Sequence, residues 1–507
     1  MSSVFGIHVG NTSACLALAK DGKIEVIAND SGDRVTPAVV TFSDSETVVG
    51  SAAKSALARN LTSSVVHNKQ LLDASLSDEQ LEEIAARHAC AMVKVEESCV
   101  KYEIKKADGK LCVYSPEDVA THIFRKLFAI ASSTARPEAD LRAVLCVPLQ
   151  FPQASRQAVM RAAEEAGFDV LQVVSEPSAA ALAYGVGLQD AEEESHCLVY
   201  RAGGTSLDAT LLQVNSGMYT VLATVREPHL GGDRFTKVLV NFLAAEFAHR
   251  WKLDPQDSRR SMTKLTAAAE TCKHVLSTVS TAHCFVESLC EGVDFSHNIT
   301  RARFENLIAA ALPEYVEPVR RVLVTAGVDA SSVGKLVLCG GSVKIPKLQQ
   351  VLGDLFPGAT KLCGLPPDEV VATGAAKHGS YMSCSFDPDC EHLSMEIPAV
   401  SRPLYARVAG QEELRCVIPA LTPVPVRRIH THEVQPAGSE ITVELHEKES
   451  KESEASRFLT KATLASVKDA TQVVVEVSIN SMGGLHLVLT EPKSQVKASV
   501  KLEAPGA

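Results

Sequence analysis

Two short glycine-containing turns constrain the fold of this chain more than any other feature of its sequence. They are residues 6–13 (GIHVGNTS) and residues 201–208 (RAGGTSLD), and Gly10 and Gly204 hold the same place in the two. An apolar strand precedes each turn and another follows it, as in β-hairpins. Two copies at domain-sized spacing indicate a duplicated fold that binds one anionic ligand from both sides.

The segments that follow the two turns also correspond. In each copy two alternating apolar strands come next, separated by Asp21-Gly22 in the first and by Ser216-Gly217 in the second. Both dipeptides are typical of hairpin turns. Two three-stranded meanders therefore begin two related domains. A coincidence of two ordinary hairpins is the other interpretation, and the shared turn sequence makes it the less favoured one.

Helical patterns and a third glycine turn follow the meanders. Residues 152–166 carry an apolar stripe between a proline and a glycine, which predicts an amphipathic helix packed on a sheet. A strand at 170–174 leads into a helix that starts at Glu176, a position that often faces a ligand in α/β folds. The glycine turn at 340–342 passes into a helix at 345–355, so backbone amides there can also approach a ligand.

The pattern changes after about residue 382. Residues 383–394 are polar and predict a linker, and residues 446–457 are charged and serine-rich and predict a loop. Three segments beyond the linker alternate with period two, as in a β-sandwich: residues 441–445, 473–479 and 485–489.

Charge and cysteine usage exclude several classes of protein. The 507 residues carry a net charge of -11 and no long basic run, which argues against direct binding of nucleic acid. The 14 cysteines form no C-x-x-C pair, so they predict reduced thiols in the cytosol rather than a local zinc site. No apolar run reaches the roughly 18 residues that a membrane span requires.

Several motifs together resemble those of the 70-kDa heat-shock chaperone family. They are the two turns, residues 147–148 (VP), 176–185 (EPSAAALAYG), 229–233 (HLGGD), 340–346 (GGSVKIP), 367–370 (PDEV) and 374–376 (GAA). The resemblance implies an α/β fold with a duplicated actin-like nucleotide-binding domain over 1–382, whose second lobe starts near 190. It further implies a linker at 383–394 and a truncated all-β sandwich at 395–507 that has no helical lid.

The resemblance also implies how a nucleotide is held at its phosphate end. The two turns would bracket the phosphates of ATP or ADP with backbone amides, which form a concave anion site. Lys69, Glu176 and Asp208 fall at positions where the family keeps catalytic side chains. The residues implied to contact the phosphates are Gly10, Asn11, Thr12, Gly203, Gly204, Thr205 and Ser206.

The adenosine end is implied to lie between one helix and the third glycine turn. Glu270, Lys273, His274 and Ser277 share a helix face because they are spaced by three and four residues. The family usually has arginine where His274 stands, and imidazole has less charge and reach than arginine. A salt-bridged surface helix is the alternative interpretation of this face. The opposite side would be Gly340, Gly341, Ser342 and Lys344, with Asp368 near the ribose.

Two departures from the family pattern concern the metal. His8 and Arg201 stand where typical members have the aspartates that organise hydrated Mg²⁺, and Val35 replaces a threonine. We therefore expect no metal site, doubtful Mg²⁺ dependence and loss of most metal-assisted hydrolysis. Arg201, together with a protonated His8, would supply part of the metal's charge. A decayed pocket that binds nothing is the alternative.

The missing lid and the polar linker resemble the short family members that pair with a zuotin-type J-protein in the ribosome-associated complex. The implied function is ATP binding in that complex, where the chain assists nascent polypeptides and meets the ribosome indirectly, without contact to nucleic acid or membrane. A conventional ATP-hydrolysing chaperone that binds unfolded peptide is the first alternative. An actin-fold sugar kinase is the second, and the β-sandwich argues against it.

Overall fold

The chain divides into two compact units, Met1–Gly217 with Leu222–Ser394, and Met395–Ala507 with Met218–Val221. The computed structural model describes residues 4–20, 23–43, 46–87, 92–96, 99–105, 111–134, 140–188, 195–215, 218–384, 399–411, 414–420, 422–424, 426–434, 440–448, 456–465, 471–480, 483–494 and 496–502. The predicted turns at 21–22 and 216–217 lie outside these residues. So does the predicted linker, apart from 383 and 384, which end a helix.

The first sheet contains the first glycine hairpin. Strands β1 (Val4–Val9), β2 (Ser13–Lys20) and β3 (Lys23–Val26) form the antiparallel meander. Strands β11 (Arg142–Val147) and β12 (Asp169–Ser175) extend it in parallel on the side of β1, which gives the order β12-β11-β1-β2-β3. A short strand, β4 (Val35–Pro37), pairs with β2.

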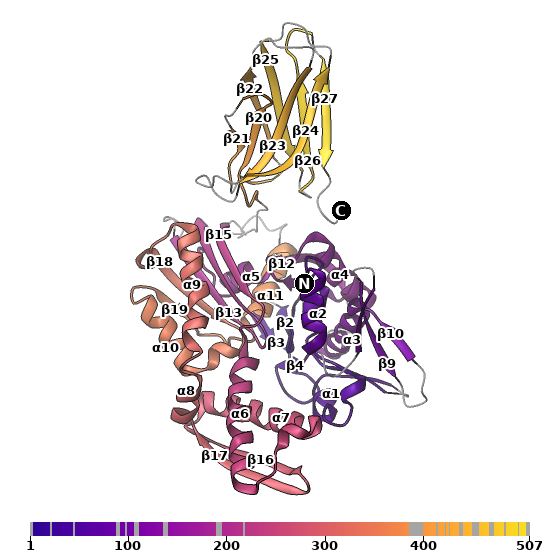
Figure 1. Cartoon of the computed structure of the whole chain (residues 1–507), viewed down its shortest axis with the longest axis vertical. Coiled ribbons are helices and arrows are strands. Elements are labelled where there is room, and N and C mark those ends of the chain that lie inside the picture. The colour runs from indigo at the N-terminus through magenta and orange to yellow at the C-terminus, as the bar shows by residue number, and fades with distance from the viewer. Residues whose placement is uncertain are drawn as a thin grey trace. The chain divides into compact units, whose positions relative to one another are not determined.

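The second sheet repeats this arrangement around the second hairpin. Its meander is β13 (Ser195–Ala202), β14 (Leu207–Asn215) and β15 (Met218–Glu227). Strands β18 (Val333–Cys339) and β19 (Thr360–Leu362) extend it in parallel on the side of β13. Both sheets therefore have the same strand order and directions, which confirms the predicted α/β fold with a duplicated actin-like domain (Figure 1).

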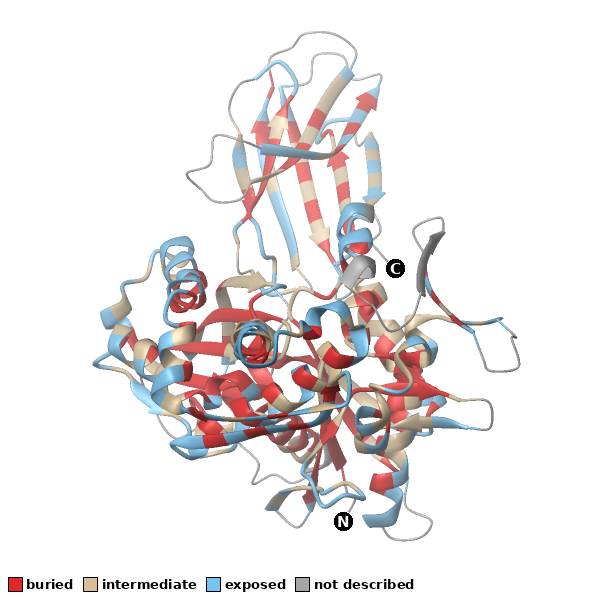
Figure 2. Ribbon diagram, turned by 60° about the horizontal axis from the view of Figure 1, so that its bottom comes forward, coloured by how far each residue is buried: buried red, intermediate tan, exposed pale blue. Residues whose placement is uncertain are grey.

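Helices pack against both sheets and enclose two hydrophobic cores, one for each sheet (Figure 2). Helix α4 (Gln153–Glu165) buries Val159, Ala162 and Ala163, in agreement with the predicted stripe, and Gly167 at φ +111° follows its end. The other principal helices are α3 (Pro116–Thr134), α5 (Glu176–Ala183), α6 (Gly232–Trp251), α7 (Arg259–Thr278), α8 (Arg301–Ile308), α9 (Leu312–Ala326), α10 (Pro346–Leu355) and α11 (Val370–Cys384).

Smaller elements complete this unit. The ribbon of β16 (Thr281–Cys290) and β17 (Val293–Thr300) packs on α7. The rest are β5 (Val40–Phe42), β6 (Thr47–Val49), α1 (Ser51–Ala56), β7 (Ser64–Val65), the 3₁₀ turns η1 (Leu61–Ser63), η2 (Asn68–Leu72), η3 (Pro255–Asp257), η4 (Ala330–Ser332) and η5 (Gly341–Lys344), α2 (Asp78–Arg87), β8 (Met92–Glu96), β9 (Cys99–Lys105) and β10 (Leu111–Tyr114).

The second unit is a sandwich of two four-stranded sheets. One has the order β21-β20-β23-β24 and the other β22-β25-β26-β27. Alternating side chains from both sheets form the core, and Val473 and Leu485 are buried in it, as their pattern predicts. The strands are β20 (Leu404–Val408), β21 (Arg415–Ile418), β22 (Val426–Glu433), β23 (Glu440–Lys448), β24 (Ser456–Ala465), β25 (Gln472–Ile479), β26 (Leu485–Thr490) and β27 (Lys497–Leu502).

The loop predicted at residues 446–457 is wrong at both ends. Strand β23 continues to Lys448 and β24 begins at Ser456, and the two pair across these positions after a register shift at Leu445/His446. The charged residues here are cross-strand neighbours, and Glu447 lies 3.9 Å from Arg457. Residues 449–455 lie outside the described part of the chain.

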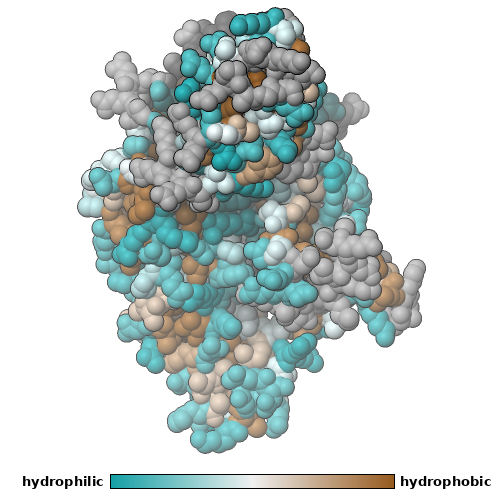
Figure 3. Space-filling view, turned by 45° about the horizontal axis from the view of Figure 1, so that its top comes forward, coloured by the Kyte–Doolittle hydropathy of each residue, from teal (hydrophilic) through white to brown (hydrophobic). Residues whose placement is uncertain are grey.

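In the part of the chain that is described, no helix is long and apolar enough to cross a bilayer. Hydrophilic residues dominate the face seen in Figure 3, where hydrophobic residues occur in separate small groups.

Helices α5 and α11 pack at unusually short distance through a glycine. A Cβ added to Gly374 would lie 1.8 Å from the carbonyl oxygen of Ala179 and 3.1 Å from its Cα. Backbone atoms cannot move aside as a flexible side chain can. The position therefore fixes the distance between α5, which begins at Glu176, and α11, which packs on β1 and β2.

Gly374→Ala is expected to lower the free energy of unfolding by about 2 to 4 kcal/mol, because the helices must separate. Gly353→Ala in α10 is the matched control, since its Cβ would meet nothing within 4 Å. The control should be stabilised by up to about 1 kcal/mol through helix propensity. Urea unfolding of both variants measures the difference, and equal stability of the two would contradict the packing argument.

Candidate functional site

A cavity of about 590 Å³ opens between the two glycine hairpins, α7 and the third glycine turn. Every nucleotide-contacting residue predicted from the sequence lines it: His8, Gly10, Asn11, Thr12, Arg201, Gly203, Gly204, Thr205, Ser206, Glu270, Lys273, His274, Ser277, Gly340, Gly341, Ser342, Lys344 and Asp368. Lys69, Glu176 and Asp208 do not line this cavity. The structure therefore brings the predicted nucleotide-contacting residues together around one cavity, whereas the three predicted catalytic residues lie outside its lining.

The two hairpins touch each other at one end of the cavity. Asn11 Nδ2 donates to Thr205 Oγ1 at 2.7 Å. A Cβ on Gly204 would lie 2.3 Å from Thr12 Cγ2, so a glycine is needed for this approach. The hairpins are thus in direct contact at the predicted phosphate end.

The second hairpin is held rigidly by the start of α6. The amides of Gly232 and Asp233 donate to the carbonyls of Gly203 and Gly204 at 2.9 and 2.8 Å. Ser342 Oγ donates to the Gly203 carbonyl as well, at 2.7 Å. Both carbonyls of the hairpin are therefore occupied by donors, from α6 and, at Gly203, from Ser342 as well.

Lys273 ties α7 to α6 beside the cavity. Its ammonium donates to Thr236 Oγ1 at 2.8 Å and to the Gly232 carbonyl at 3.1 Å, and lies 2.7 Å from Glu270 Oε2. Burial raises the pKa of Glu270, but the hydrogen bond from His274 and the charge of Lys273 outweigh burial and hold that pKa well below its ordinary value. His274 is 66% exposed, so its ring is open to the cavity.

The third glycine turn closes the other side. Gly340 has φ +86°, and a Cβ there would lie 2.3 Å from the carbonyl oxygen of Ala202, so only glycine fits. Lys344 Nζ donates to Asp368 Oδ2 at 2.6 Å. The other oxygen, Asp368 Oδ1, is buried without a hydrogen-bond partner and remains an open acceptor. An acceptor in this place suits a ribose hydroxyl.

A buried cluster of charges lies behind the hairpins. Glu176 accepts at Oε1 from Lys69 Nζ at 2.5 Å and from His8 Nε2 at 3.3 Å. Its other oxygen, Oε2, lies 2.8 Å from Arg201 Nε. The side chains of Glu176, Lys69 and Arg201 are 2%, 6% and 11% exposed, so each charge depends on the others for compensation.

Arg201 also reaches the second carboxylate. Its Nη2 donates to Asp208 Oδ2, so one guanidinium bridges Asp208 and Glu176. Arg226 Nε lies 3.7 Å from Asp208 Oδ1 and Arg226 Nη1 3.6 Å from Asp73 Oδ2. Three basic groups therefore face three carboxylates, and the cluster is balanced without an added cation.

The pKa values in this cluster correct one expectation. Burial lowers the pKa of His8, and the bond to Glu176 only partly offsets this, so the imidazole is neutral near pH 7. The protonated His8 expected from the sequence is therefore not supported, and Arg201 carries the positive charge alone. Burial raises the pKa of Glu176, but Arg201 and Lys69 hold it well below its ordinary value.

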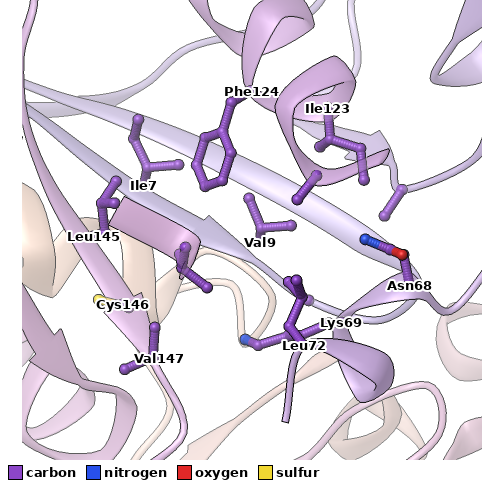
Figure 4. Close-up of a pocket in the computed structure, with 14 residues that line it drawn as sticks. Ile7, Val9, Asn68, Lys69, Leu72, Ile123, Phe124, Leu145, Cys146 and Val147 are labelled. Atoms are coloured by element: carbon purple, nitrogen blue, oxygen red, sulfur yellow. The ribbon is translucent and has the colours of Figure 1, made fainter. Parts of the chain in front are cut away.

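His8 and Arg201 separate the cavity from the retained catalytic positions. Lys69 borders a separate cavity of about 20 Å³, with Ile7, Val9 and Leu72 around it, as Figure 4 shows. Glu176 and Asp208 border another, of about 10 Å³. Spaces of this size hold about one water molecule at most. A ligand in the large cavity therefore meets His8 and Arg201 before it can reach Glu176.

The donor set does not fit Mg²⁺. This ion prefers one or two carboxylates together with phosphate oxygens and water. Both oxygens of Glu176 and one oxygen of Asp208 already face Lys69, His8 or Arg201, while Asp208 Oδ1 is buried without a hydrogen-bond partner.

An anionic nucleotide fits the cavity better. The charged residues that line it are Arg34, Lys54, Arg201, Lys273, Lys344, Asp33, Glu270, Asp368 and Glu369. Basic groups outnumber carboxylates there by one, whereas the whole chain has a net charge of -11. The lining of the cavity is thus nearly balanced in charge, in contrast to the acidic chain as a whole.

Sequence reasoning missed several residues of the site. Thr236 bonds both Lys273 and Glu270, and Arg226 and Asp73 complete the buried cluster. Arg34 and Glu369 pair across the cavity at 3.5 Å. The motif at 229–233 signals the start of α6 and hence Thr236, but nothing in the sequence signals the pairing of Arg226 with Asp73.

The family model and the relatives that match this chain agree with each other. A family model described as "Hsp70 protein" matches residues 4–506. The chain is 37% identical to human "Heat shock 70 kDa protein 14" over 99% of both chains, and 38% identical to the zebrafish protein of that name over 100% of this chain and 99% of the other. It is 42% identical to the rat protein over 89% of this chain and 88% of the other.

Glu176→Gln is expected to cost about 3 to 5 kcal/mol of unfolding free energy at pH 7, because Lys69 and Arg201 lose their buried carboxylate. The pKa of Glu176 is lower in the folded than in the unfolded chain, so its stabilisation is present above about pH 4.3 and is lost as the pH falls. The difference between the variant and the parent should therefore shrink below about pH 4.

Urea unfolding of both proteins between pH 7 and pH 3.5 measures this dependence. Glu165→Gln is the control, because Glu165 pairs with Arg125 at 2.9 Å on the surface and should change stability by less than about 1 kcal/mol. A Glu176→Gln variant as stable as this control would contradict the balanced cluster.

Proposed function

This chain belongs to the Hsp70 family, and we propose that within the family it is an ATP-binding chaperone component with weak or absent ATP hydrolysis of its own. It assists nascent polypeptides together with a zuotin-type J-protein in a ribosome-associated complex. ATP or ADP occupies the large cavity, and its role is structural or regulatory.

The position of His8 and Arg201 carries this proposal. Both line the large cavity, whereas Lys69, Glu176 and Asp208 lie behind them and are occupied by one another and by Arg201. Phosphoryl transfer depends on positioning and on neutralisation of charge, mostly by a metal in this class of enzyme. A site that holds its carboxylates in internal ion pairs retains nucleotide binding and lacks most of that assistance.

Arg201 supplies the charge that a metal would otherwise provide. Burial lowers the pKa of its guanidinium, but the charges of Asp208 and Glu176 raise that pKa by more than burial lowers it. The side chain therefore stays cationic at any physiological pH. It is 11% exposed and lines the cavity beside Gly203 and Ser206. A phosphate placed against the second hairpin lies next to a fixed positive charge.

The J-protein partner rests on resemblance to the short, lidless members of the family. Among the described residues of the second unit every element is a strand, as expected of such members. The chain would then assist nascent polypeptides by acting with the J-protein and, through it, with a conventional chaperone of the same family.

A conventional chaperone that hydrolyses ATP is the second candidate, and one observation favours it. Lys69, Glu176 and Asp208 are all retained and lie within one connected cluster. ATP turnover measured with and without unfolded peptide distinguishes the two. Brisk turnover that rises with peptide supports the conventional chaperone.

We expect the affinity for ATP to change less than tenfold between excess Mg²⁺ and excess EDTA, because Arg201 rather than a metal lies beside the phosphates. Isothermal titration with the full chain measures both affinities. A drop of a hundredfold or more in EDTA would remove the idea of a metal-independent site, and no binding in either buffer would show a decayed pocket.

The double variant His8→Asp/Arg201→Asp tests the same idea in the opposite direction, because it should introduce metal dependence. It places carboxylates where typical members of the family have them, so its ATP affinity should become at least tenfold weaker in EDTA than in Mg²⁺. Glu165→Gln, altered on the surface, should behave like the parent chain. Metal dependence that stays unchanged in the double variant would show that these two positions do not decide it.

The chain is expected to co-purify from cytosol with a J-protein in a stable one-to-one complex and to sediment with translating ribosomes only when that J-protein is present. Affinity purification followed by mass spectrometry tests the first part, and sedimentation with and without the J-protein tests the second. Ribosome binding by the chain alone would contradict an indirect contact.

A further inference from the structure

Two cysteine thiols lie against each other in the core behind the nucleotide cavity. Cys272 belongs to α7 and Cys284 to β16, and their side chains are in hydrogen-bond contact. They are 2% and 1% exposed and belong to the same hydrophobic core. Neither residue lines the cavity described above.

The geometry of α7 and β16 accounts for this contact. Cys272 precedes the end of α7 at Thr278 by six residues, or roughly 9 Å of helix. Cys284 follows the start of β16 at Thr281 by three residues, or roughly 10 Å of strand. Because a short connection joins the two elements, the cysteines lie at the same height on facing, buried sides.

We propose that Cys272 and Cys284 form an intramolecular disulfide when the chain meets a peroxide, and that this bond restrains the helix that lines the nucleotide cavity. A disulfide requires two cysteines whose side chains face each other across a short distance, and the contact between these two thiols makes them the candidate pair. The paired thiols thus form a modification site outside the nucleotide-binding residues.

The reaction balances with hydrogen peroxide as the oxidant. The Cys272 thiolate attacks one peroxide oxygen and becomes a sulfenic acid, and the hydroxide that leaves takes up the thiol proton as water. Cys284 sulfur then attacks the sulfenic sulfur, and the displaced hydroxide leaves as a second water with the Cys284 proton. The two thiols lose two electrons, and the peroxide is reduced.

The order of attack follows from the environment of each thiol. The hydrogen bond from Cys284 lowers the pKa of Cys272, although burial raises it, while the same bond raises the pKa of Cys284. Cys272 is therefore the better thiolate. Since both sulfurs are buried, oxidant reaches them only when α7 and β16 separate locally, so the reaction is slower than that of an exposed thiol.

The consequence for the cavity follows from the faces of α7. Leu265, Ala269, Cys272 and Leu276 face the core, while Glu270, Lys273, His274 and Ser277 line the cavity. Lys273 is adjacent to Cys272 and holds the start of α6 through Gly232 and Thr236. A bond that draws Cys272 toward β16 therefore shifts Lys273 and the contacts it makes.

Peptide mapping of the full chain tests the site. The chain is treated with hydrogen peroxide, its remaining thiols are alkylated, and digestion is followed by mass spectrometry. We expect one cross-linked peptide that joins Cys272 and Cys284 and lacks two hydrogen atoms, reversed by dithiothreitol. Exposed Cys363 should react first, and Cys363→Ala should leave the cross-link unchanged.

Cys272→Ala and Cys284→Ala should each lose the cross-link. Two outcomes would overturn the proposal: both thiols still free after Cys363 is oxidised, or Cys272 oxidised to sulfinic acid without a cross-link in the parent chain. These are read from the parent chain itself, so the test stands even when a variant fails to fold.

A second measurement, of ATP affinity, tests the effect of the disulfide on α7, and it rests on the proposed function. Oxidation should weaken ATP binding of the parent chain at least threefold and leave that of Cys284→Ala unchanged. A cross-link with unaltered ATP affinity would overturn the restraint on α7. If the reduced chain binds no ATP at all, the proposed function fails, whereas the peptide map still decides the disulfide.

Discussion

The bridge from Arg201 to Glu176 and Asp208 is the interaction on which the centre of this structure depends. A buried carboxylate is costly unless an opposite charge and hydrogen bonds satisfy it, and here one guanidinium satisfies two of them. Lys69 and His8 complete the contacts of Glu176. The two lobes meet through this cluster, because Glu176 begins α5 after the first sheet and Arg201 lies on β13 of the second.

The bridge also lies at the border between the nucleotide cavity and the retained catalytic positions. In a fold built from two similar halves, each half presents a hairpin to the same cavity, and the remaining side chains decide what happens to the ligand. Arg201 offers a positive charge to the cavity while it keeps Asp208 and Glu176 engaged. One side chain at the end of β13 therefore faces the cavity and both retained carboxylates at once.

Much of the fold follows from the sequence, because glycine turns and alternating strands are local signals. The hairpins at Gly10 and Gly204 predict the duplication, which the strand order confirms. The strand ends near His446 are harder to predict from the sequence, because charged residues suggest a loop unless the cross-strand partner is known. The cavity face of α7 follows from helical spacing. The neutral state of His8 and the contact of Arg226 with Asp73 depend on burial and on distant neighbours, which no local pattern reports.

The direct contact between the two hairpins has a consequence for how fast a ligand can come and go. Asn11 and Thr205 are hydrogen-bonded, and Gly204 lies against Thr12, so the two hairpins are in direct contact at the phosphate end of the cavity. A ligand that leaves between the hairpins must first break this bond. Along that route, the residence time of a nucleotide would depend on how often the two hairpins separate, and not only on the contacts to its base.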